Sequence, residues 1–478
     1  MRASASTEIW RLSAIEIGRL LARRVVSPVE VVSEVFDRRE RLDPILNTLV
    51  TLDRDVAMAA AAASEERYRA GTSLGPLDGI PVTTKDNLYA EGLRATWGSR
   101  LYADFVAPVD DIAVARLRSA GAIIIGKTNT PEFAISGHTD NPLFGVTRNP
   151  WNPDLTPGGS SGGAVAGVAA GLFPLALATD AGGSIRRPAS YTGVLGLRPS
   201  TGAVARAFGF PPLALDFQAV GPIARSVGDL ELMFEAIVGA DVRDRASLGA
   251  ATAMAMNEPA RSVERLRIGW VRDLPGVPVD AEIPPALKQV ATALGELGHI
   301  VDEVTAPFDP EAVNAIFGTL SGAGLSRAVT ACDDWRDRID PALVPMVEQA
   351  ATIDAASHVR AIDEVNALRV AASGLFDRVD VFLMPVSAAM PWPAEQRFPA
   401  TIAGETAGPR TAGSFATFVN LLGVPAISVP APVPSGSLPI GAQLIGKFGD
   451  DRRLLRIASE LETARPWGDR WPELALAR

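Results

Sequence analysis

Apolar segments that read as buried strands alternate with helical segments along most of this sequence. The stretch AVARLRSAGAIIIGKTN (113–129) combines helical spacing with a following apolar run, and ALKQVATALGELGHIVDEVTAP (286–307) repeats the pattern. Further short apolar runs occur in GIPVTT, LFPLALATD, VDVFLMPV and GVPAISVPAPV. Helices that alternate with fully apolar strands are typical of layered folds in which helices cover the sheet. The sequence therefore predicts an α/β fold with a largely covered sheet.

The N-terminal region is predicted to be helical. Ser13 and Glu16 have the spacing of a capping box, and so do Ser27 and Glu30, with a proline at the first helical position of the second. The alanine-rich segment 53–70 indicates a third helix.

No repeat, heptad pattern or obvious linker divides the chain. The segment DDRRLLRIASELETA (450–464) is predicted to be the last element, a helix. Residues 240–262 are predicted to be the loosest connection. We therefore expect one large domain over residues 1–478.

Composition excludes several classes of function. The 478 residues carry a formal net charge of −10, which argues against a nucleic-acid or anionic-membrane surface. Cys332 is the single cysteine, which fits a reducing cytoplasm and excludes a multi-cysteine metal site. Glu8 and Glu16 interrupt the region where an export signal needs an apolar core. The uncharged run 155–179 contains prolines and many glycines, so we interpret it as buried backbone rather than a membrane span.

Three positions in the first half of the chain carry candidate chemistry. Lys85 ends a predicted strand, Ser160 lies in GGSSGG (158–163), and Ser184 lies in TDAGGSIRRPAS (179–190). A serine hydroxyl needs a base before it is a good nucleophile. A lysine serves as that base when burial and nearby positive charge lower its pKa.

The three histidines are weaker candidates for the base. His299 lies at a helix-to-strand junction and His358 in a polar helical pattern, so a structural role is predicted for both. His138, in SGHTDNPLFG, is kept as a candidate for contact with substrate.

These motifs together resemble the amidase signature family. The resemblance rests on GIPVTTKDN around Lys85, on GGSSGG, and on TDAGGSIRRPA around Ser184, in this order. It implies an α/β/α layered sandwich with a large mixed central sheet covered by helices on both faces. It also implies four regions: N-terminal helices (1–70), a signature core (71–240), a variable substrate-pocket region (241–411), and C-terminal strands and helix (412–478).

The resemblance also implies roles for individual residues. Ser184 would be the nucleophile, Ser160 a proton-relaying serine after a cis peptide bond at Gly159, and Lys85 the neutral base. The route needs no metal and no cofactor. The backbone N–H groups of four residues would form the oxyanion hole, namely Ala181, Gly182, Gly183 and Ser184. Ser161 and Thr179 would orient the lysine and the relaying serine, and Asp180 and Arg186 would support the loop.

Departures from the family pattern favour a free-standing hydrolase. Arg187 stands where the glutamyl-tRNA amidotransferase branch has glutamine, and the tyrosine-aspartate-glycine pattern of that branch is missing. An amidotransferase subunit that works with partners remains the alternative. A second alternative is a Ser-His-Asp α/β-hydrolase that uses GGSSG (158–162) as its nucleophile elbow with His299 or His358. GGSSGG does not continue into the Lys-Ser of a phosphate-binding loop.

Substrate preference is less constrained by the sequence. The segments AFGFPPLALDFQ, FGTLSGAG and PVSAAMPW are predicted to surround the acyl pocket, with Phe208, Phe317 and Trp392 as apolar contacts. Arg187 is predicted either to bind a substrate carboxylate or carbonyl or to pair with a local carboxylate. We expect small, apolar or aryl amides as substrates with water, and carbamates (urethanes) and esters by the same route. The family suggests a homodimer.

Overall fold

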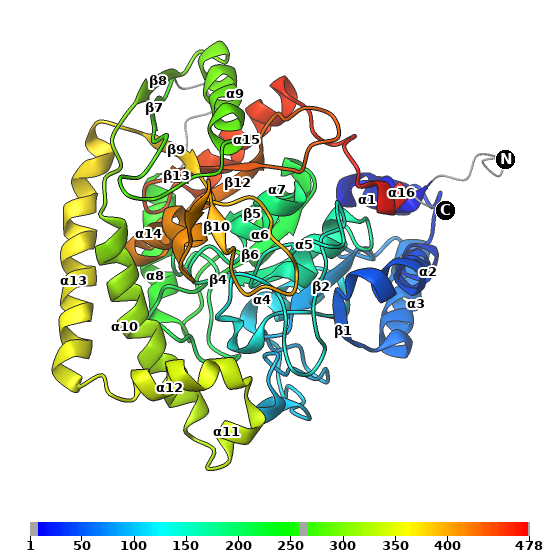
Figure 1. The fold of residues 1–478 in the computed structure, drawn as a ribbon. Helices are drawn as coiled ribbons and strands as arrows, with labels where there is room; N and C mark the ends of the chain where they lie inside the picture. The colour runs from blue at the N-terminus through cyan, green and yellow to red at the C-terminus, as the bar shows by residue number, and fades with distance from the viewer. Residues whose placement is uncertain (1–7, 258–264, 477–478) are drawn as a thin grey trace.

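The computed structural model describes residues 8–257 and 265–476, with helices arranged around one large sheet (Figure 1). The strands of the main sheet are β1 Leu49–Leu52, β2 Pro81–Lys85, β3 Ile123–Thr128, β4 Leu175–Asp180, β5 Leu195–Arg198, β6 Ala219–Ala224, β7 Arg267–Trp270, β8 Ile300–Glu303, β9 Val381–Pro385, β12 Ala426–Pro430 and β13 Gly441–Gly446. A separate two-stranded sheet contains β10 Thr401–Ile402 and β11 Glu405–Thr406. The helices are α1 Ala14–Ala22, α2 Pro28–Leu46, α3 Arg54–Ala70, α4 Ile112–Ser119, α5 Gly162–Ala169, α6 Arg186–Thr192, α7 Val227–Ile237, α8 Arg245–Met256, α9 Ile283–Glu296, α10 Pro310–Val329, α11 Trp335–Arg338, α12 Val344–Ala350, α13 Ala355–Ser373, α14 Ser414–Leu422, α15 Asp451–Ala464 and α16 Glu473–Leu476.

The main sheet is mixed, with eleven strands in the order β1-β3-β2-β4-β6-β5-β12-β13-β9-β7-β8. Strands β3, β2 and β4 run parallel, as do β9, β7 and β8. The pairings from β4 through to β9 are antiparallel. The C-terminal strands β12 and β13 therefore lie in the middle of the sheet and join its two parts.

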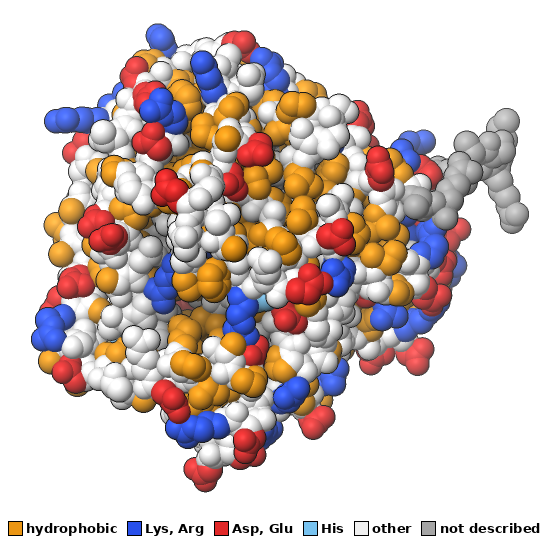
Figure 2. Space-filling view, viewed as in Figure 1, with side chains coloured by type: hydrophobic (Ala, Val, Ile, Leu, Met, Phe, Trp, Pro, Cys, Tyr) orange, Lys and Arg blue, Asp and Glu red, His pale blue; other side chains and the backbone are white. Residues whose placement is uncertain are grey.

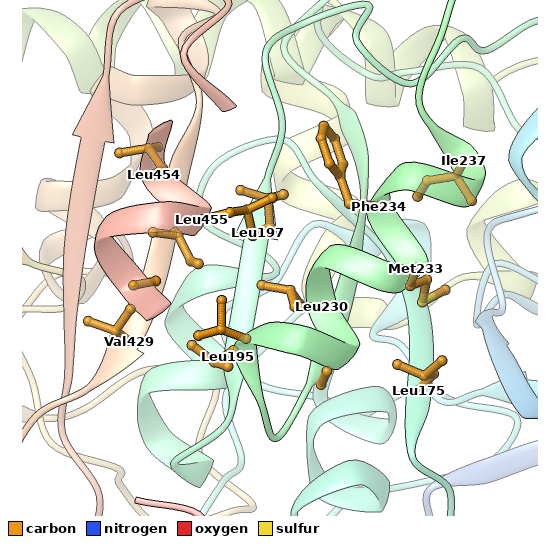
Figure 3. Close-up of a cluster of buried hydrophobic side chains, with 14 of the residues drawn as sticks. Leu175, Leu195, Leu197, Leu230, Met233, Phe234, Ile237, Val429, Leu454 and Leu455 are labelled. Carbon is orange, nitrogen blue, oxygen red and sulfur yellow. The ribbon is translucent and has the colours of Figure 1, made fainter. Parts of the chain in front are cut away.

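Helices cover both faces of this sheet, as the sequence predicts. Successive side chains of a strand point to opposite faces, and β4 shows this clearly. Leu175 and Leu177 pack into a core with helices α7, α9 and α15, part of which is shown in Figure 3. Ala176 and Ala178 face the other way and pack with helix α5. The α/β/α layered sandwich is thus confirmed.

The N-terminal helices begin at the capping residues that the sequence predicts. Both capping boxes are present, with the Ser13 and Ser27 hydroxyls accepting the N–H groups of Glu16 and Glu30. Asp53 caps α3 in the same way. The short strand β1 between α2 and α3 was not predicted; it pairs with β3 at the edge of the sheet.

Two predictions about local structure were wrong. Residues 245–256, inside the segment predicted to be a loose connection, form the alanine-rich helix α8, whose N-terminus is capped by Asp244. Residues 258–262 of that segment lie outside the described residues. Helix α15 is not the last element, because the short helix α16 follows it.

The uncharged run 155–179 folds into buried structure, as predicted. Its residues from Thr156 onward are almost all buried, and they form α5 and most of β4. Within residues 8–257 and 265–476, none of the helices combines the length and the apolar character that a membrane crossing requires.

Candidate active site

Two neighbouring parallel strands bring the candidate residues to one edge of the sheet. Strand β2 ends at Lys85 and strand β4 ends at Asp180, and the two strands are hydrogen-bonded side by side. The carboxyl ends of parallel strands meet at the same edge. The loop 181–185 follows β4 and leads into α6, and GGSSGG leads into α5, so both serine loops approach Lys85.

Lys85 is fully buried among oxygen atoms. Its Nζ lies 2.6 Å from Ser160 Oγ, 3.0 Å from Ser161 Oγ and 3.4 Å from the Thr179 carbonyl oxygen. Asn87 donates to the Thr179 hydroxyl at 3.0 Å, and this hydrogen bond fixes the Thr179 side chain as well. Ser161 and Thr179, expected from the sequence to orient Lys85 and Ser160, both lie within hydrogen-bonding distance of the lysine.

Burial changes the acid–base properties of Lys85. It lowers the pKa of Lys85 from 10.5 to about 7, although the negative charge of Asp180 opposes the shift. Among the described residues, no carboxylate lies within ion-pair distance of Lys85. The neutral amine is therefore well populated near neutral pH.

The loop that carries Ser160 passes close to another segment of backbone. The Gly159–Ser160 peptide bond is cis. A Cβ atom at Gly159 would lie 2.6 Å from the carbonyl oxygen of His138 and 2.8 Å from that of Ser136. Only glycine fits at this close approach. The Ser161 N–H donates to the Ser184 carbonyl oxygen at 3.2 Å and so ties the two serine loops together.

The loop that carries Ser184 is shaped by Asp180. Gly183 has φ +99°, a conformation that favours glycine. Its N–H donates to Asp180 Oδ1 at 2.7 Å, and the Ile185 N–H donates to Oδ2 at 3.0 Å. The expectation that Gly183 contributes a free N–H group to an oxyanion hole is therefore corrected, because Asp180 already accepts from it. No hydrogen bond of the described residues uses the N–H groups of Ala181, Gly182 or Ser184.

Asp180 and Arg186 form a fully buried ion pair, with Arg186 Nε and Nη2 each 3.0 Å from a carboxylate oxygen. Burial opposes ionisation of Asp180, but the Arg186 charge and the hydrogen bonds from Arg186 and Asn420 outweigh it. The pKa of Asp180 is consequently held well below its usual range. The supporting role predicted for Asp180 and Arg186 matches this arrangement.

Two residues of this network were missed by the sequence reasoning. Asn420 donates to Asp180 Oδ1 at 2.8 Å, and Gln443 accepts from Arg186 Nη1 at 2.9 Å. Both are fully buried, on α14 and β13. Their signal is a single amide inside an apolar segment, FVNLLG and IGAQLIG, since a buried amide needs polar partners.

The serine loops open into a cleft of about 440 Å³. Ser160 and Ser184 both line it, together with Thr179, Ala181 and Gly182. A larger cavity of about 700 Å³ surrounds Asp216, Arg369 and Lys447, but it shares no lining residue with this cleft. Because a reaction needs its nucleophile at the substrate, the smaller cleft is the candidate site. Other residues that line it are Phe133, Ala134, Ile135, Ser136, Gly137, Arg187, Leu213, Ala214, Gln218, Phe317, Ser321, Ala342, Leu343, Met346, Arg397, Phe398, Pro409, Arg410, Gly413 and Thr417.

Comparisons with known proteins show the family to which the chain belongs. The family model described as Amidase matches residues 30–455, which is most of the chain. The chain belongs to the amidase family. Members of this family are hydrolases that act on carbon–nitrogen bonds, and the resemblance seen in the sequence is confirmed.

Amidase relatives of two kinds are similar to the chain. The A subunit of glutamyl-tRNA(Gln) amidotransferase from Thermosynechococcus vestitus is 33% identical, with 96% of this chain and 99% of the relative covered. Acylamidase of Rhodococcus erythropolis is also 33% identical, with 96% and 97% covered. The solved structure of a bacterial aryl acylamidase of the amidase signature family is similar to the chain, with a TM-score of 0.88 and 31% sequence identity. The match covers 98% of this chain and 99% of the acylamidase chain.

Two of the five predicted substrate contacts, Arg187 and Phe317, line the amidase cleft. A Cβ atom at Gly182 would lie 3.2 Å from Phe317 Cζ, so the ring packs directly on the loop before Ser184. Arg187 forms no ion pair with a carboxylate of the described residues, and its Nη2 donates to the Gly159 carbonyl oxygen at 3.2 Å.

The other three predicted contacts are corrected, because they do not line the cleft. Phe208 is 37% exposed and stacks with Arg243. Trp392 is buried against Tyr191, and its indole N–H donates to the Gln396 carbonyl oxygen. An aromatic side chain in an apolar segment is thus not necessarily part of the cleft.

His138, the third of these, is buried beside Ser136, with Nδ1 2.7 Å from the Ser136 hydroxyl. Burial lowers the pKa of His138 to about 4. The neighbouring residues Ser136 and Gly137 line the cleft in its place.

The histidines of the Ser-His-Asp alternative lie elsewhere. His299 accepts the Leu266 N–H, and its Nε2 is 3.2 Å from a Glu460 oxygen. His358 is on α13. Neither lines the cleft that contains Ser160 and Ser184, so nothing in this geometry supports that alternative.

Proposed function

We propose that the chain is a free-standing amidohydrolase that cleaves small amides through an acyl-enzyme on Ser184. The observation that carries the proposal is the burial of Lys85 against Ser160 at 2.6 Å, without a carboxylate partner among the described residues. A lysine with its pKa near 7 is matched to proton transfer at neutral pH. Ser160 and Ser184 line the same cleft, which is large enough to admit a small amide.

The hydrogen-bonding neighbours of Lys85 suit its neutral form. A neutral amine has two N–H groups and one lone pair. Ser161 Oγ and the Thr179 carbonyl oxygen accept the two N–H groups, which leaves the lone pair for the hydroxyl proton of Ser160. In the proposed reaction, Ser160 takes a proton from Ser184 while it gives its own to Lys85.

The proposed reaction follows from this proton path. Ser184 Oγ attacks the amide carbonyl carbon as its proton passes through Ser160 to Lys85. The carbonyl oxygen becomes an oxyanion, which the free N–H groups of Ala181, Gly182 and Ser184 stabilise. Lys85 returns the proton through Ser160 to the amide nitrogen, the C–N bond breaks and the amine leaves. Water then attacks the ester by the same path, and the acid is released.

The lining of the cleft supports apolar or aryl amides as substrates. Phe317, Leu213, Leu343, Met346 and Phe398 supply apolar surface around the nucleophile. Carbamates and esters pass through a similar oxyanion at a carbonyl carbon, so we propose them as further substrates of the same site. A homodimer and a cytoplasmic location stay predictions.

The second candidate function is that of the A subunit of an amidotransferase, to which the chain is similar. Free glutamine carries an ammonium group as well as a carboxylate. None of the described residues that line the cleft is an aspartate or glutamate that could pair with that ammonium group. This observation favours the free-standing amidohydrolase.

The test uses aryl amides, aliphatic amides, carbamates, esters and glutamine as substrates of the purified chain, without a partner protein. Turnover of an amide by the wild type and none by Ser184→Ala is expected. Rapid quenching and mass spectrometry should show an acyl group on the peptide that contains Ser184. Equal turnover by the two proteins would exclude Ser184 as the nucleophile, and turnover of glutamine alone would favour the amidotransferase function.

A further inference from the structure

The charged residues that line the cleft are all basic. Arg187, Arg397 and Arg410 line it together with Gln218, and no described lining residue is acidic. The chain as a whole has a net charge of −10, and on the face seen in Figure 2 acidic and basic side chains are intermingled. The purely basic lining is therefore a local property of the cleft.

Arg187 is a buried cation that lacks an anionic partner within the described part of the chain. The residue is 9% exposed, and its Nε is buried without a hydrogen-bond partner. Its one hydrogen bond through the guanidinium group goes to the neutral Gly159 carbonyl oxygen. A Cβ atom at Gly137 would lie 2.9 Å from Nη2, and one at Gly413 would lie 2.7 Å from Nη1. The two glycines thus leave the guanidinium its space beside the cleft.

Arg410 and Gln218 also have donor groups that the described residues leave without an anionic or accepting partner. Arg410 is half-buried, donates to the Asn314 carbonyl oxygen at 2.7 Å, and has no carboxylate partner among the described residues. Its guanidinium group lies 5.5 Å from the centre of the Phe317 ring. Gln218 Nε2 is buried, and none of the residues that the structure describes accepts a hydrogen bond from it. Arg397 differs, because Asp340 neutralises it.

We propose that the substrate carries a carboxylate group, which binds to Arg187 and Arg410 in this cleft. The proposal rests on the proposed amidohydrolase function and adds the substrate class. A buried charge without a partner is costly, and a bound anion removes that cost. The planar guanidinium group suits a carboxylate, which accepts two parallel hydrogen bonds. Gln218 supplies a further donor to an acceptor-rich ligand.

Two matched pairs of substrates test the proposal and locate the carboxylate. Succinanilate and its carboxamide analogue differ in charge on the acyl side, and 4-acetamidobenzoate and 4-acetamidobenzamide differ on the amine side. Chromatography measures the release of the aromatic amine, so other amide groups do not interfere. In at least one of the two pairs, the wild type should prefer the carboxylate substrate over its carboxamide analogue by about 10- to 100-fold in kcat/KM. This is the range expected for hydrogen bonds to a charged group.

Substitution of the arginines should remove this preference. Arg410→Met should lower the ratio of carboxylate to carboxamide towards one, whatever its effect on the absolute rates. Arg187→Met should lower the ratio too, even if its loss also reduces all rates through Gly159. Arg243→Met is the control, because Arg243 lies on the surface, pairs with Asp241 and does not line the cleft; its ratio should equal that of the wild type.

Binding measurements separate this proposal from the proposed function. Calorimetry with the Ser184→Ala variant measures the affinity for succinanilate, 4-acetamidobenzoate and the two carboxamides without any turnover. Tighter binding of a carboxylate that depends on Arg187 and Arg410 supports the proposal even if no acyl-enzyme forms. Equal or weaker binding of both carboxylates, or a preference that survives both arginine substitutions, overturns it. Hydrolysis of the neutral amides alone would then leave the amidohydrolase function standing.

Discussion

Lys85 Nζ lies 2.6 Å from Ser160 Oγ, and both side chains are almost completely removed from water. The contact joins a strand end to a loop 75 residues further along the chain. Water cannot stabilise an ammonium group there, no carboxylate of the described residues forms an ion pair with it, and the charge of Asp180 offsets only part of the cost of burial. The same burial that makes the lysine costly to charge makes it a base at neutral pH.

The pH dependence of the reaction tests this property of Lys85. The neutral amine is the active form, so kcat/KM should fall about tenfold per pH unit below the pKa and reach a plateau above about 7. An unperturbed lysine would place the rise near 10.5. Initial rates with a neutral anilide between pH 5 and 9 give the profile. A rate that still rises tenfold per pH unit up to pH 9, without a plateau, would contradict the proposed state of Lys85.

Ser160 and Ser161 provide a comparison between adjacent hydroxyl groups. Ser160→Ala should reduce kcat by about 10²–10⁴-fold, because it removes the proton path between Lys85 and Ser184. Ser161→Ala should reduce kcat much less, since the Ser161 hydroxyl accepts from Lys85 at 3.0 Å and donates to the Thr179 carbonyl oxygen at 3.4 Å rather than to Ser184. Steady-state kinetics of both variants decides between the two hydroxyls, and the reverse order of effects would identify Ser161 as the relay.

The buried pair of Arg186 and Asp180 should matter for stability. Arg186→Met leaves the Asp180 carboxylate buried without its cation, which costs about 3–5 kcal/mol of unfolding free energy. Chemical denaturation followed by fluorescence measures the change. Arg336→Met is a suitable control, because Arg336 and Glu348 form an exposed ion pair whose loss should be barely measurable. Equal stability of the two variants would show that the buried pair does not hold the loop.

Phe317 and Phe208 provide a comparison between an aromatic side chain that lines the cleft and one that lies outside it. Phe317→Ala should raise KM for aryl amides about tenfold or more, because it removes apolar contact beside Gly182. Phe208→Ala should leave KM unchanged, since Phe208 stacks with Arg243 outside the cleft. A panel of aryl and aliphatic amides measures both. A larger effect of Phe208→Ala would place the substrate along a different surface.

The parts of the site predicted from sequence are those encoded in short motifs. Lys85, Ser160 and Ser184 each lie in a glycine-rich or strand-end segment whose local conformation follows from a few neighbouring residues. The role of Gly183 was not predictable, because its N–H is directed by the carboxylate of Asp180 in the folded loop.

Residues that meet only through the tertiary fold were harder to predict. Asn420 and Gln443 reach the Asp180–Arg186 pair from more than 230 residues away. Phe208 and Trp392 were chosen for residue type and position, but side-chain direction decided against them. Phe317 and Arg187 line the cleft, and nothing in their local sequence distinguishes them from the other two.

The order of strands in the sheet has a consequence for the growing polypeptide. Strands β1–β6 and β7–β9 leave the ribosome before β12 and β13, which fill the gap between β5 and β9. Until then the nascent chain holds two incomplete sheets, and each presents an unpaired edge that is prone to aggregation. Gln443, which binds Arg186, arrives on the same late strand β13. Protection from aggregation and a completed nucleophile loop are therefore reached together, only after β12 and β13 have been translated.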